Sequence, residues 1–384
     1  MNFPEATFAA LALLSLALVF WQWLAAARFP LHRRVNDLSF APAITLLKPL
    51  KGCDATTTES FQSWFHQNYS GQTQILFGVA DAGDPVCKIV RELIEKNPGC
   101  DAQIVVCAES LGANGKVSTL IQLERLAKHP LILVSDADVR VPPDFLANIA
   151  APLRDPKAGL VNCFYRLANP VTAAMRCEAI AINADFWSQV LQAASLKPIN
   201  FALGAVMLAR RKLLAEIGGF TALANCLADD YQLGNRIAQN GHRIALCPVV
   251  VDCWHPPMSW RGVWKHQLRW ARTIRVCRPV PYFFSILSNA TLWPLLWLMV
   301  SLILSKTFYF PLIAFACLLV RMGLAQDLQR RFMQSRDNLA PPWLVPVKDL
   351  LQAAVWLGAF LGNTVEWRGQ KKRLRPDGTL FEEK

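Results

Sequence analysis

Acidic residues occur at three places along the chain, and a short Arg-Trp motif follows them. The three places are Asp81, the pair Asp136 and Asp138, and the adjacent pair Asp229 and Asp230. The first two places come directly after apolar runs that are typical of buried strands. Carboxylates at strand ends that face one crevice are what an open α/β sheet uses to hold a nucleotide and its metal. This order therefore predicts a nucleotide-binding site.

The Asp-Ala-Asp sequence at 136–138 is the candidate metal site. It follows the apolar run 131–135. Mg²⁺ and Mn²⁺ prefer oxygen ligands and bind through one or two carboxylates plus substrate phosphates. We therefore expect Asp136 and Asp138 to contact the nucleotide, with Asp138 also meeting a divalent cation. The alternative is a solvated turn that ends a strand.

Two further residues are expected to bind the nucleotide. Asp81 ends the apolar run 74–80, where its carboxylate can accept from a uracil N–H or a ribose hydroxyl, although Asp-Ala-Gly also suits an Asx-turn. Lys116 stands in a Gly- and Asn-containing loop that opens a helix, and backbone N–H groups at a helix start suit phosphate. Its ammonium can reach a diphosphate. A plain surface turn is the alternative, and the spacing is not that of a P-loop.

The third acidic place, Asp229 and Asp230, begins a helix-like segment. One of the two side chains can simply cap that helix. The other, Asp230, is the candidate general base, because a carboxylate within hydrogen-bond reach can deprotonate an acceptor hydroxyl. We place Asp229 with the nucleotide-binding residues.

A basic, aromatic segment at 256–280 predicts an amphipathic helix in the plane of lipid headgroups. Within it, Arg269 can neutralise a leaving diphosphate and Trp270 can stack on a sugar or an acceptor. We place Gln267, beside them, with the residues that bind the nucleotide-sugar. His255, which precedes the segment, is either a further metal ligand or a loop residue.

The elements that must position these residues alternate between strand-like and helix-like patterns. Such alternation predicts a parallel sheet in an α/β layer fold. The expected strands are 43–47, 74–80, 103–107, 131–135, 159–165, 205–209 and 243–249. The expected helices between the first strands are 57–68, 85–96 and 115–128.

Composition indicates one globular domain together with membrane segments. The chain has 384 residues, of which 53% are hydrophobic, and a formal net charge of +12. The hydrophobic share exceeds the roughly 45–50% of soluble domains. The positive charge suits a membrane surface or an anionic phosphate substrate, and no nucleic-acid-binding motif is evident. The 11 cysteines form no CxxC pair and are interpreted as free thiols in a reducing compartment.

Residues 6–27 form an apolar stretch long enough to span a bilayer. A cleaved signal peptide is the alternative, but the stretch lacks a basic start and is too long for the apolar part of one. The basic residues Arg28, Arg33 and Arg34 follow at once, which favours a retained anchor with the next domain in the cytoplasm.

Two more apolar stretches, 282–305 and 307–325, predict a membrane hairpin that turns at Lys306 and Thr307. The last stretch, 350–362, is shorter and leads to a basic tail. A spanning helix there would place that tail outside, so we favour a re-entrant or interfacial helix, with a fourth span as the alternative.

Taken together, the motifs resemble the ceramide glucosyltransferase family, which are inverting glycosyltransferases of the GT-A fold, and its bacterial relatives associated with hopanoid biosynthesis. The residues that carry the resemblance are Lys48-Pro49-Leu50-Lys51-Gly52, Asp81, Gly115-Lys116, Asp136-Ala137-Asp138, Gly204-Ala205-Val206-Met207, Ala228-Asp229-Asp230-Tyr231, Arg269-Trp270 and Val365-Glu366-Trp367-Arg368-Gly369.

The resemblance implies a GT-A-like (Rossmann-like), mostly parallel sheet domain with an N-terminal transmembrane helix and C-terminal membrane helices. It also implies a UDP-sugar donor, a divalent cation (Mg²⁺ or Mn²⁺) and a lipid acceptor with a free hydroxyl. Asp230 would be the base, and Arg269 and Trp270 would belong to a motif that begins with Gln or Arg three residues before the Arg. Here that first position is His266, with Gln267 next to it, so both stay candidates for the role.

We therefore expect a membrane anchor at 1–30, a cytoplasmic GT-A domain at 40–255, an interfacial helix at 256–280, a transmembrane hairpin at 281–326 and a last helix with a basic tail at 343–384. The expected function is hexose transfer from a UDP-sugar to a hydroxyl of a ceramide-like, hopanoid or diacylglycerol lipid at the bacterial inner membrane. Alternatives are a polyprenyl-phosphate sugar transferase, a processive polysaccharide synthase and a non-catalytic membrane scaffold.

Overall fold

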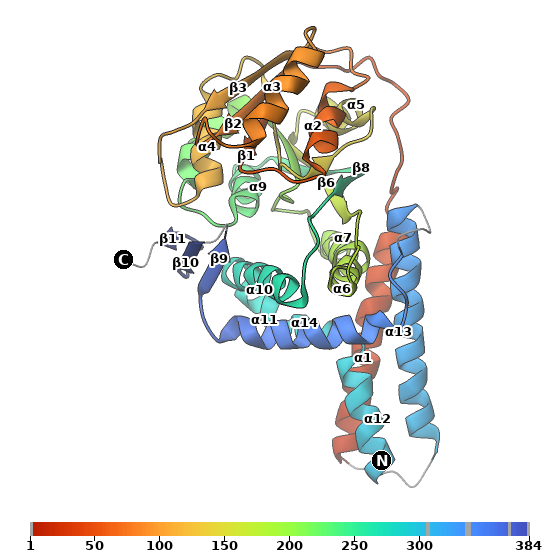
Figure 1. Ribbon diagram of the computed structural model, residues 1–384. Helices are drawn as coiled ribbons and strands as arrows, with labels where there is room; N and C mark the ends of the chain where they lie inside the picture. Colours follow the sequence, from red (N-terminus) through yellow and green to blue (C-terminus); the bar gives the residue numbers. More distant parts are fainter. Residues whose placement is uncertain (1–2, 305–307, 335–338, 368–369, 382–384) are drawn as a thin grey trace. The chain divides into compact units, whose positions relative to one another are not determined.

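The computed structural model describes residues 3–304, 308–334, 339–367 and 370–381. The chain divides into two compact units (Figure 1). The sheet unit comprises residues 30–169, 197–256 and 373–381, and the helical unit comprises residues 3–29, 170–196 and 257–372. The expected turn at Lys306 and Thr307 and the tail residues Arg368 and Gly369 lie outside the described residues.

The sheet unit is built on an eight-stranded sheet with the order β3-β2-β1-β4-β7-β6-β8-β5. Its strands are β1 (Ile44–Leu50), β2 (Thr73–Val79), β3 (Asp101–Val106), β4 (Leu131–Ser135), β5 (Val139–Arg140), β6 (Ala158–Leu167), β7 (Val206–Arg210) and β8 (Arg243–Cys253). Neighbours β3-β2, β2-β1, β1-β4 and β6-β8 are parallel, whereas β7 is antiparallel to β4 and β6, and β5 to β8. The expected mostly parallel α/β sheet is confirmed, and each expected strand is present with its ends shifted by a few residues.

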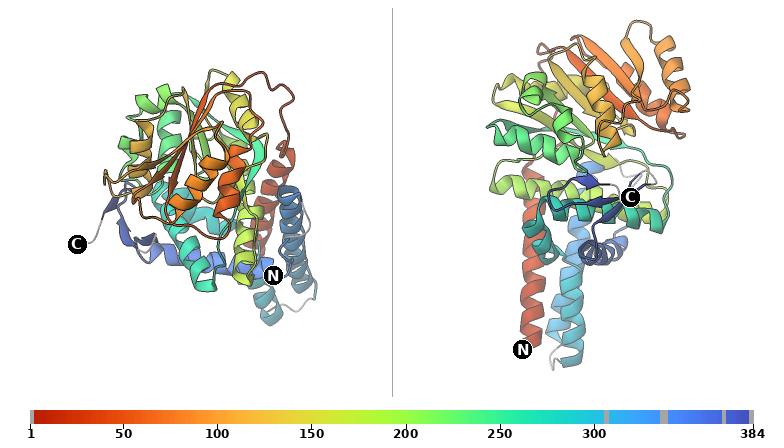
Figure 2. Two further views of the ribbon diagram at one scale, coloured as in Figure 1. Left: turned by 45° about the horizontal axis from the view of Figure 1, so that its top comes forward. Right: turned by 90° about the vertical axis from the view of Figure 1, so that its left-hand side faces the viewer.

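Helices cover both faces of this sheet because its central strands are apolar on both sides (Figure 2). Adjacent β1 residues show the alternation, since Leu46 packs in one core and Leu47 in the other. The first core includes α2 (Thr57–Phe65), α3 (Val86–Lys96) and α5 (Phe145–Ala150). The second includes α4 (Gly115–Glu124), α8 (Arg211–Glu216) and α9 (Asp229–Gln239). The strands are thereby held rigidly enough for their ends to position side chains.

The remaining elements of the sheet unit are short. They are the 3-10 turns η1 (Ala151–Arg154) and η3 (Phe220–Leu223) and the strand β11 (Leu380–Phe381), which pairs antiparallel with the end of β10 (Gln370–Leu374). All eleven cysteines of the chain are free thiols, and most are buried. This agrees with their interpretation as small apolar core residues.

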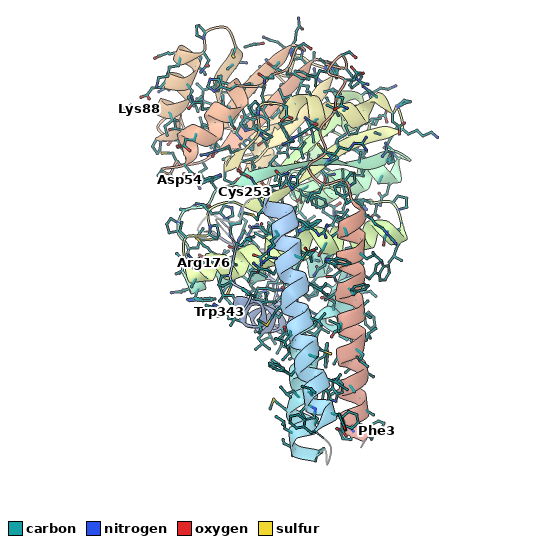
Figure 3. The ribbon with its side chains drawn as sticks, turned by 90° about the vertical axis from the view of Figure 1, so that its right-hand side faces the viewer. Phe3, Asp54, Lys88, Arg176, Cys253 and Trp343 are labelled. Atoms are coloured by element: carbon teal, nitrogen blue, oxygen red, sulfur yellow. The ribbon has the colours of Figure 1, made fainter. Side chains whose placement is uncertain are left out.

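The helical unit contains the apolar and amphipathic segments. Its elements are α1 (Phe3–Arg28), α6 (Ala173–Ile180), the π-helical turn η2 (Ala181–Phe186), α7 (Trp187–Leu196), α10 (Trp260–Cys277), α11 (Pro279–Phe284), η4 (Ser285–Ser288), α12 (Leu292–Leu304), α13 (Tyr309–Met333), α14 (Leu344–Phe360) and β9 (Thr364–Trp367). Helices α1 and α13 run side by side, with Phe3 at the far end of α1 (Figure 3).

Within the described residues, α1 and α13 are long and apolar enough to cross a membrane. A third span results if residues 279–288 and α12 count as one segment bent by 46°. The first arm of the expected hairpin is therefore interrupted, because the Asn289 side chain accepts from the Leu292 N–H at 2.9 Å and starts a new helix there. Helix α14 has 17 residues, fewer than the about 20 that a span needs, and lies across the direction of α1 and α13 (Figure 1).

A buried group of four charges joins helices of this unit. The Arg321 Nη2 lies 2.9 Å from a carboxylate oxygen of Asp185 and 2.9 Å from one of Asp349. Lys348 also pairs with both carboxylates. Each of the four side chains is less than a tenth exposed, so the two positive and two negative charges must neutralise one another. Removing one partner of such a buried pair typically costs about 3–5 kcal/mol, so the group holds α13, η2 and α14 together.

Candidate active site

The two carboxylates of the Asp-Ala-Asp sequence lie just beyond β4, as expected. The Asp136 N–H donates to the Ala205 carbonyl at 3.1 Å, and the Asp138 carbonyl accepts from the Trp254 N–H at 3.1 Å. These bonds fix the turn between β4 and β5 from two sides. The side chains of Asp136 and Asp138 stay 39% and 33% exposed, so both open onto accessible space.

His255 contacts the second of these carboxylates, with its Nε2 2.9 Å from the Asp138 Oδ2. Two hydrogen bonds with Asn169 hold the His255 backbone, one through its N–H and one through its carbonyl. Burial pushes the pKa of Asp138 up, but the hydrogen bond and charge of His255 bring it below its usual value. Asp138 is therefore ionised at neutral pH.

Lys116 links the first acidic pair to the second. It sits in the first turn of α4, where the Asn114 side chain caps the helix by accepting from the N–H groups of Lys116 and Val117. Its Nζ lies 2.8 Å from the Asp136 Oδ1 and 3.3 Å from the Asp229 Oδ2. Burial alone would lower the pKa of Lys116, but these two carboxylates raise it well above its usual value. The loop is thus a charged part of the site and not a plain surface turn.

Asp229 and Asp230 occupy the first turn of α9, but neither caps it. The cap residue is Ala228, without a side-chain hydrogen bond. The expectation that one Asp serves as the helix cap is therefore wrong. Asp230 instead lies against Gly204, where an added Cβ would come within 2.6 Å of its Oδ2. Burial and the neighbouring charge of Asp229 raise the pKa of Asp230 to about 6.

Lys48 lies beside the candidate site, although the sequence alone assigns it no role. It is fully buried inside β1, and its Nζ donates to the Ser135 hydroxyl at 3.1 Å and to the Asp136 carbonyl at 2.7 Å. Burial lowers the pKa of Lys48 to about 7, against the opposing charges of Asp138 and Asp136. A lysine inside the otherwise apolar run ITLLKPL was the available signal.

Asp81 stands apart from this cluster. It lies exposed beyond the end of β2, and its Oδ1 accepts from the Gly83 N–H at 2.9 Å. This is the Asx-turn that was its alternative interpretation. Because β2 is parallel to β1 and β1 to β4, Asp81 is on the same edge of the sheet as Asp136.

The other predicted site residues, Gln267, Arg269 and Trp270, are on α10 in the helical unit. The Gln267 amide donates to the Glu178 Oε1 at 2.8 Å, and the ring centroid of Trp270 lies 4.4 Å from that of His266. Glu178, on α6, was not foreseen.

A divalent cation fits the residues beyond β4. Among the described residues there is no cluster of three or more His, Cys, Asp or Glu side chains that would enclose a cation. Mg²⁺ and Mn²⁺ need only one or two carboxylates when phosphate oxygens complete the shell. Asp138 and His255 supply such a partial set, and a cation there would replace the proton that they share.

The family model described as "Glycosyl transferase family 21" matches residues 7–380. Ceramide glucosyltransferase 3 of Caenorhabditis elegans is 25% identical over 221 residues, which cover 57% of this chain and 48% of that protein. A ceramide glucosyltransferase of Candida albicans is 33% identical over 124 residues, which cover 29% of this chain and 23% of that protein. The chain thus spans about half or less of these relatives' length.

A solved structure shares the fold along nearly the whole chain. It is the mannosyltransferase PcManGT from Pyrobaculum calidifontis in complex with GDP-Man and Mn²⁺, with a TM-score of 0.58 and 20% identity over 93% of this chain and 99% of that one. The GT-A-like fold class expected from the motifs is confirmed.

Proposed function

The chain belongs to glycosyl transferase family 21, and from this we propose that it transfers a hexose from a UDP-sugar to a hydroxyl group of a membrane lipid. The candidate donors are UDP-glucose and UDP-N-acetylglucosamine, and the candidate acceptors are ceramide-like, hopanoid or diacylglycerol lipids. The observation that carries the proposal is the ordered group Lys116, Asp136, Asp229 and Asp230 at one edge of the sheet. This group supplies charged side chains that could bind the donor and, in Asp230, a carboxylate that could act as the base.

Asp230 is the proposed base. A general base works best when its pKa is close to the working pH, and the pKa of Asp230 is raised to about 6. Asp230 takes the proton of the lipid hydroxyl, whose oxygen forms the new bond to the anomeric carbon. The bond from that carbon to the diphosphate breaks at the same time, and UDP leaves with the electron pair. A single displacement inverts the anomeric centre, so an α-linked donor gives a β-linked product.

The remaining site residues bind and neutralise the donor. Asp81 and Asp136 contact the nucleotide, Lys116 faces the diphosphate and Asp229 holds Lys116 in place. Asp138 and His255 would hold the divalent cation, which supplies positive charge for the leaving diphosphate. Arg269 adds positive charge and Trp270 stacks on the sugar or the acceptor. Groups that meet charge developing in the transition state are the ones that raise the rate.

We also propose where the protein lies in the cell. The two candidate spans, α1 and α13, support attachment to a membrane. We place the sheet unit on the cytoplasmic side of a bacterial inner membrane, because Arg28, Arg33 and Arg34 follow α1. A reporter fused after Arg34 should show a cytoplasmic location, and a periplasmic readout would overturn the orientation.

The proposal is tested by following radiolabel from UDP-glucose and UDP-N-acetylglucosamine into a lipid extract, with Mg²⁺ or Mn²⁺ and then with EDTA. We expect labelling of a lipid that EDTA abolishes, and mass spectrometry of that lipid names the acceptor. Folded protein that labels no lipid from either donor would contradict the proposal.

A further inference from the structure

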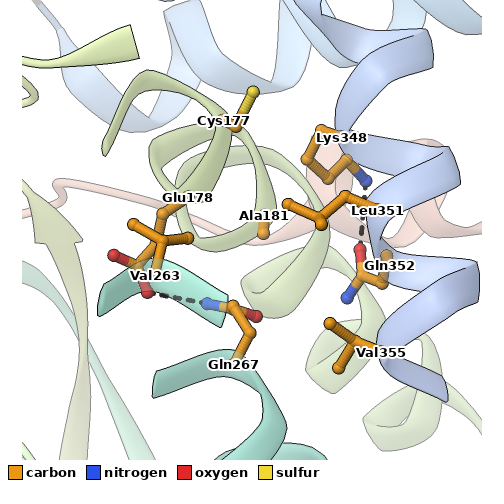
Figure 4. Close-up of a pocket in the computed structure, with 9 residues that line it drawn as sticks. All are labelled: Cys177, Glu178, Ala181, Val263, Gln267, Lys348, Leu351, Gln352 and Val355. Atoms are coloured by element: carbon orange, nitrogen blue, oxygen red, sulfur yellow. Dashed lines mark hydrogen bonds between the residues drawn. The ribbon is translucent and has the colours of Figure 1, made fainter. Parts of the chain in front are cut away.

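Glu178, on α6, is a buried carboxylate that contacts two successive residues of α10. Its side chain is fully buried. The same oxygen, Oε1, lies 2.7 Å from the His266 Nδ1 and 2.8 Å from the Gln267 Nε2. Figure 4 shows the bond between Gln267 and Glu178. An ionised carboxylate only accepts hydrogen bonds, so with Glu178 ionised both the His266 Nδ1 and the Gln267 amide donate to it.

This pair of bonds fixes how α10 is rotated about its axis. Successive residues of a helix point about 100° apart, because a turn holds 3.6 residues. His266 and Gln267 can therefore reach the same oxygen only when the side of α10 that lies between their two side chains faces Glu178. A second hydrogen bond connects the same two helices. Thr172 is the N-cap of α6, and its hydroxyl donates at 2.8 Å to the carbonyl of Met258, just before α10.

His266 passes this constraint on to the Arg-Trp motif. Residues four apart on a helix are neighbours on its surface. The ring of Trp270 accordingly packs on the ring of His266, with their centroids 4.4 Å apart. The chain of contacts therefore runs from Glu178 through His266 to Trp270, the residue next to Arg269.

We propose that Glu178 is a positioning residue that sets the orientation of Trp270 and Arg269 through His266. The inference rests on the proposed function, since it is the transfer reaction that uses these two residues. It also assigns the first position of the Arg-Trp motif to His266, the residue that lies between Glu178 and Trp270. Gln267 is a second support, since its amide donates to the same carboxylate oxygen.

A matched control is available in the same small cavity. Gln352, on α14, lines this cavity together with Glu178 and Gln267, and its amide oxygen accepts from the Lys348 Nζ at 3.2 Å (Figure 4). Gln352→Ala therefore changes the cavity wall and leaves the hydrogen bonds of Glu178 with His266 and Gln267 in place.

The test uses the full chain in lipid nanodiscs and measures kcat and KM for the UDP-sugar and for the lipid acceptor. Glu178→Ala should lower kcat by up to about 100-fold, the effect of a displacement of about 1 Å in a catalytic group. Glu178→Gln keeps an acceptor oxygen at the same place and should retain an intermediate rate. The donor KM should stay near the wild-type value in both variants, and Gln352→Ala should match wild type in every parameter.

A double-mutant cycle separates positioning from a general role in folding. If Glu178 acts through His266, Glu178→Ala combined with His266→Phe should lower kcat no further than the stronger single variant. His266→Phe should also cost more than Gln267→Leu. Additive effects, or equal effects of the two α10 variants, would overturn the assignment.

Amide hydrogen exchange of residues 260–277 gives a readout that does not depend on turnover. Exchange there should rise in Glu178→Ala and stay at the wild-type level in Gln352→Ala, and unchanged exchange in Glu178→Ala would refute the role of Glu178. Wild type that turns over no lipid would contradict the proposed function, while the exchange result would still decide whether Glu178 orders α10.

Discussion

Gly204 is the residue whose replacement tests the position of Asp230 without changing Asp230 itself. An alanine Cβ at this position would lie 2.6 Å from the Asp230 Oδ2, whereas ordinary contact begins at 3.4 Å. The carboxylate must therefore retreat by about 0.8 Å, and displacements of about 1 Å can lower a catalysed rate by about 100-fold. Gly204→Ala should thus lower kcat by about 10- to 100-fold.

The assay is lipid glycosylation at saturating donor, accompanied by thermal unfolding of the same preparation. Gly204 and Asp230 are both partly buried. Because overpacking typically costs about 1–3 kcal/mol in a well-packed core, some loss of stability is expected here and must be separated from loss of rate. Gly99→Ala is the matched control, because nothing lies within 4 Å of an added Cβ there. A folded Gly204→Ala protein with wild-type kcat would refute the claim that the location of the Asp230 carboxylate matters for transfer.

Three further predictions concern charge and metal. Because the charge of Asp229 helps to raise the pKa of Asp230 to about 6, kcat should decrease as the pH drops below about 6. Asp229→Asn should move this decrease in kcat to lower pH, and a decrease that stays at the same pH would contradict the coupling of the two carboxylates. His255→Ala should raise the Mn²⁺ concentration needed for half-maximal rate, whereas Asp252→Asn, which breaks only an ion pair with Arg166, should not; equal shifts would argue against His255 as a ligand. Lys48 has a folded-state pKa lowered from 10.5 to about 7, so the folded state binds fewer protons than the unfolded state between these values and stability should rise with pH there. In metal-free protein, Lys48→Met should flatten that rise in the melting temperature between pH 7 and pH 10, and an unchanged slope would show that Lys48 is not its source.

The sequence predicted the sheet and much of the acidic cluster because both depend on local patterns. An apolar run such as 131–135 predicts a buried strand, and the residues directly after the run must lie at the end of that strand. Parallel strands bring their ends to one edge, which is why the sequence alone could place Asp136 and Asp81 on the same side of the sheet. The ion pair of Lys116 with Asp136 was not predicted, because the sequence analysis assigned Lys116 to a diphosphate and not to a carboxylate of the chain.

The parts that escaped prediction depend on contacts between residues far apart in sequence. Nothing local to Gly204 shows that it lies against Asp230, and nothing local to Glu178 shows that it bonds His266 and Gln267. The same holds for Arg321, which looks like a single charge in an apolar stretch until Asp185 and Asp349 are seen beside it. Tertiary packing determines which residues become such partners, and the hydrophobic periodicity of the sequence does not predict these contacts.

The role of Asp230 as the base is tested by comparing Asp230→Asn with wild type on two acceptors, a ceramide-like lipid with a free hydroxyl and a polyprenyl phosphate. A phosphate acceptor already carries negative charge and needs no base, whereas a hydroxyl must lose its proton. We expect wild type to glycosylate the hydroxyl lipid and Asp230→Asn to do so at least about 100-fold more slowly. Folded Asp230→Asn that transfers to the hydroxyl at the wild-type rate, or wild type that uses only the phosphate, would contradict this expectation.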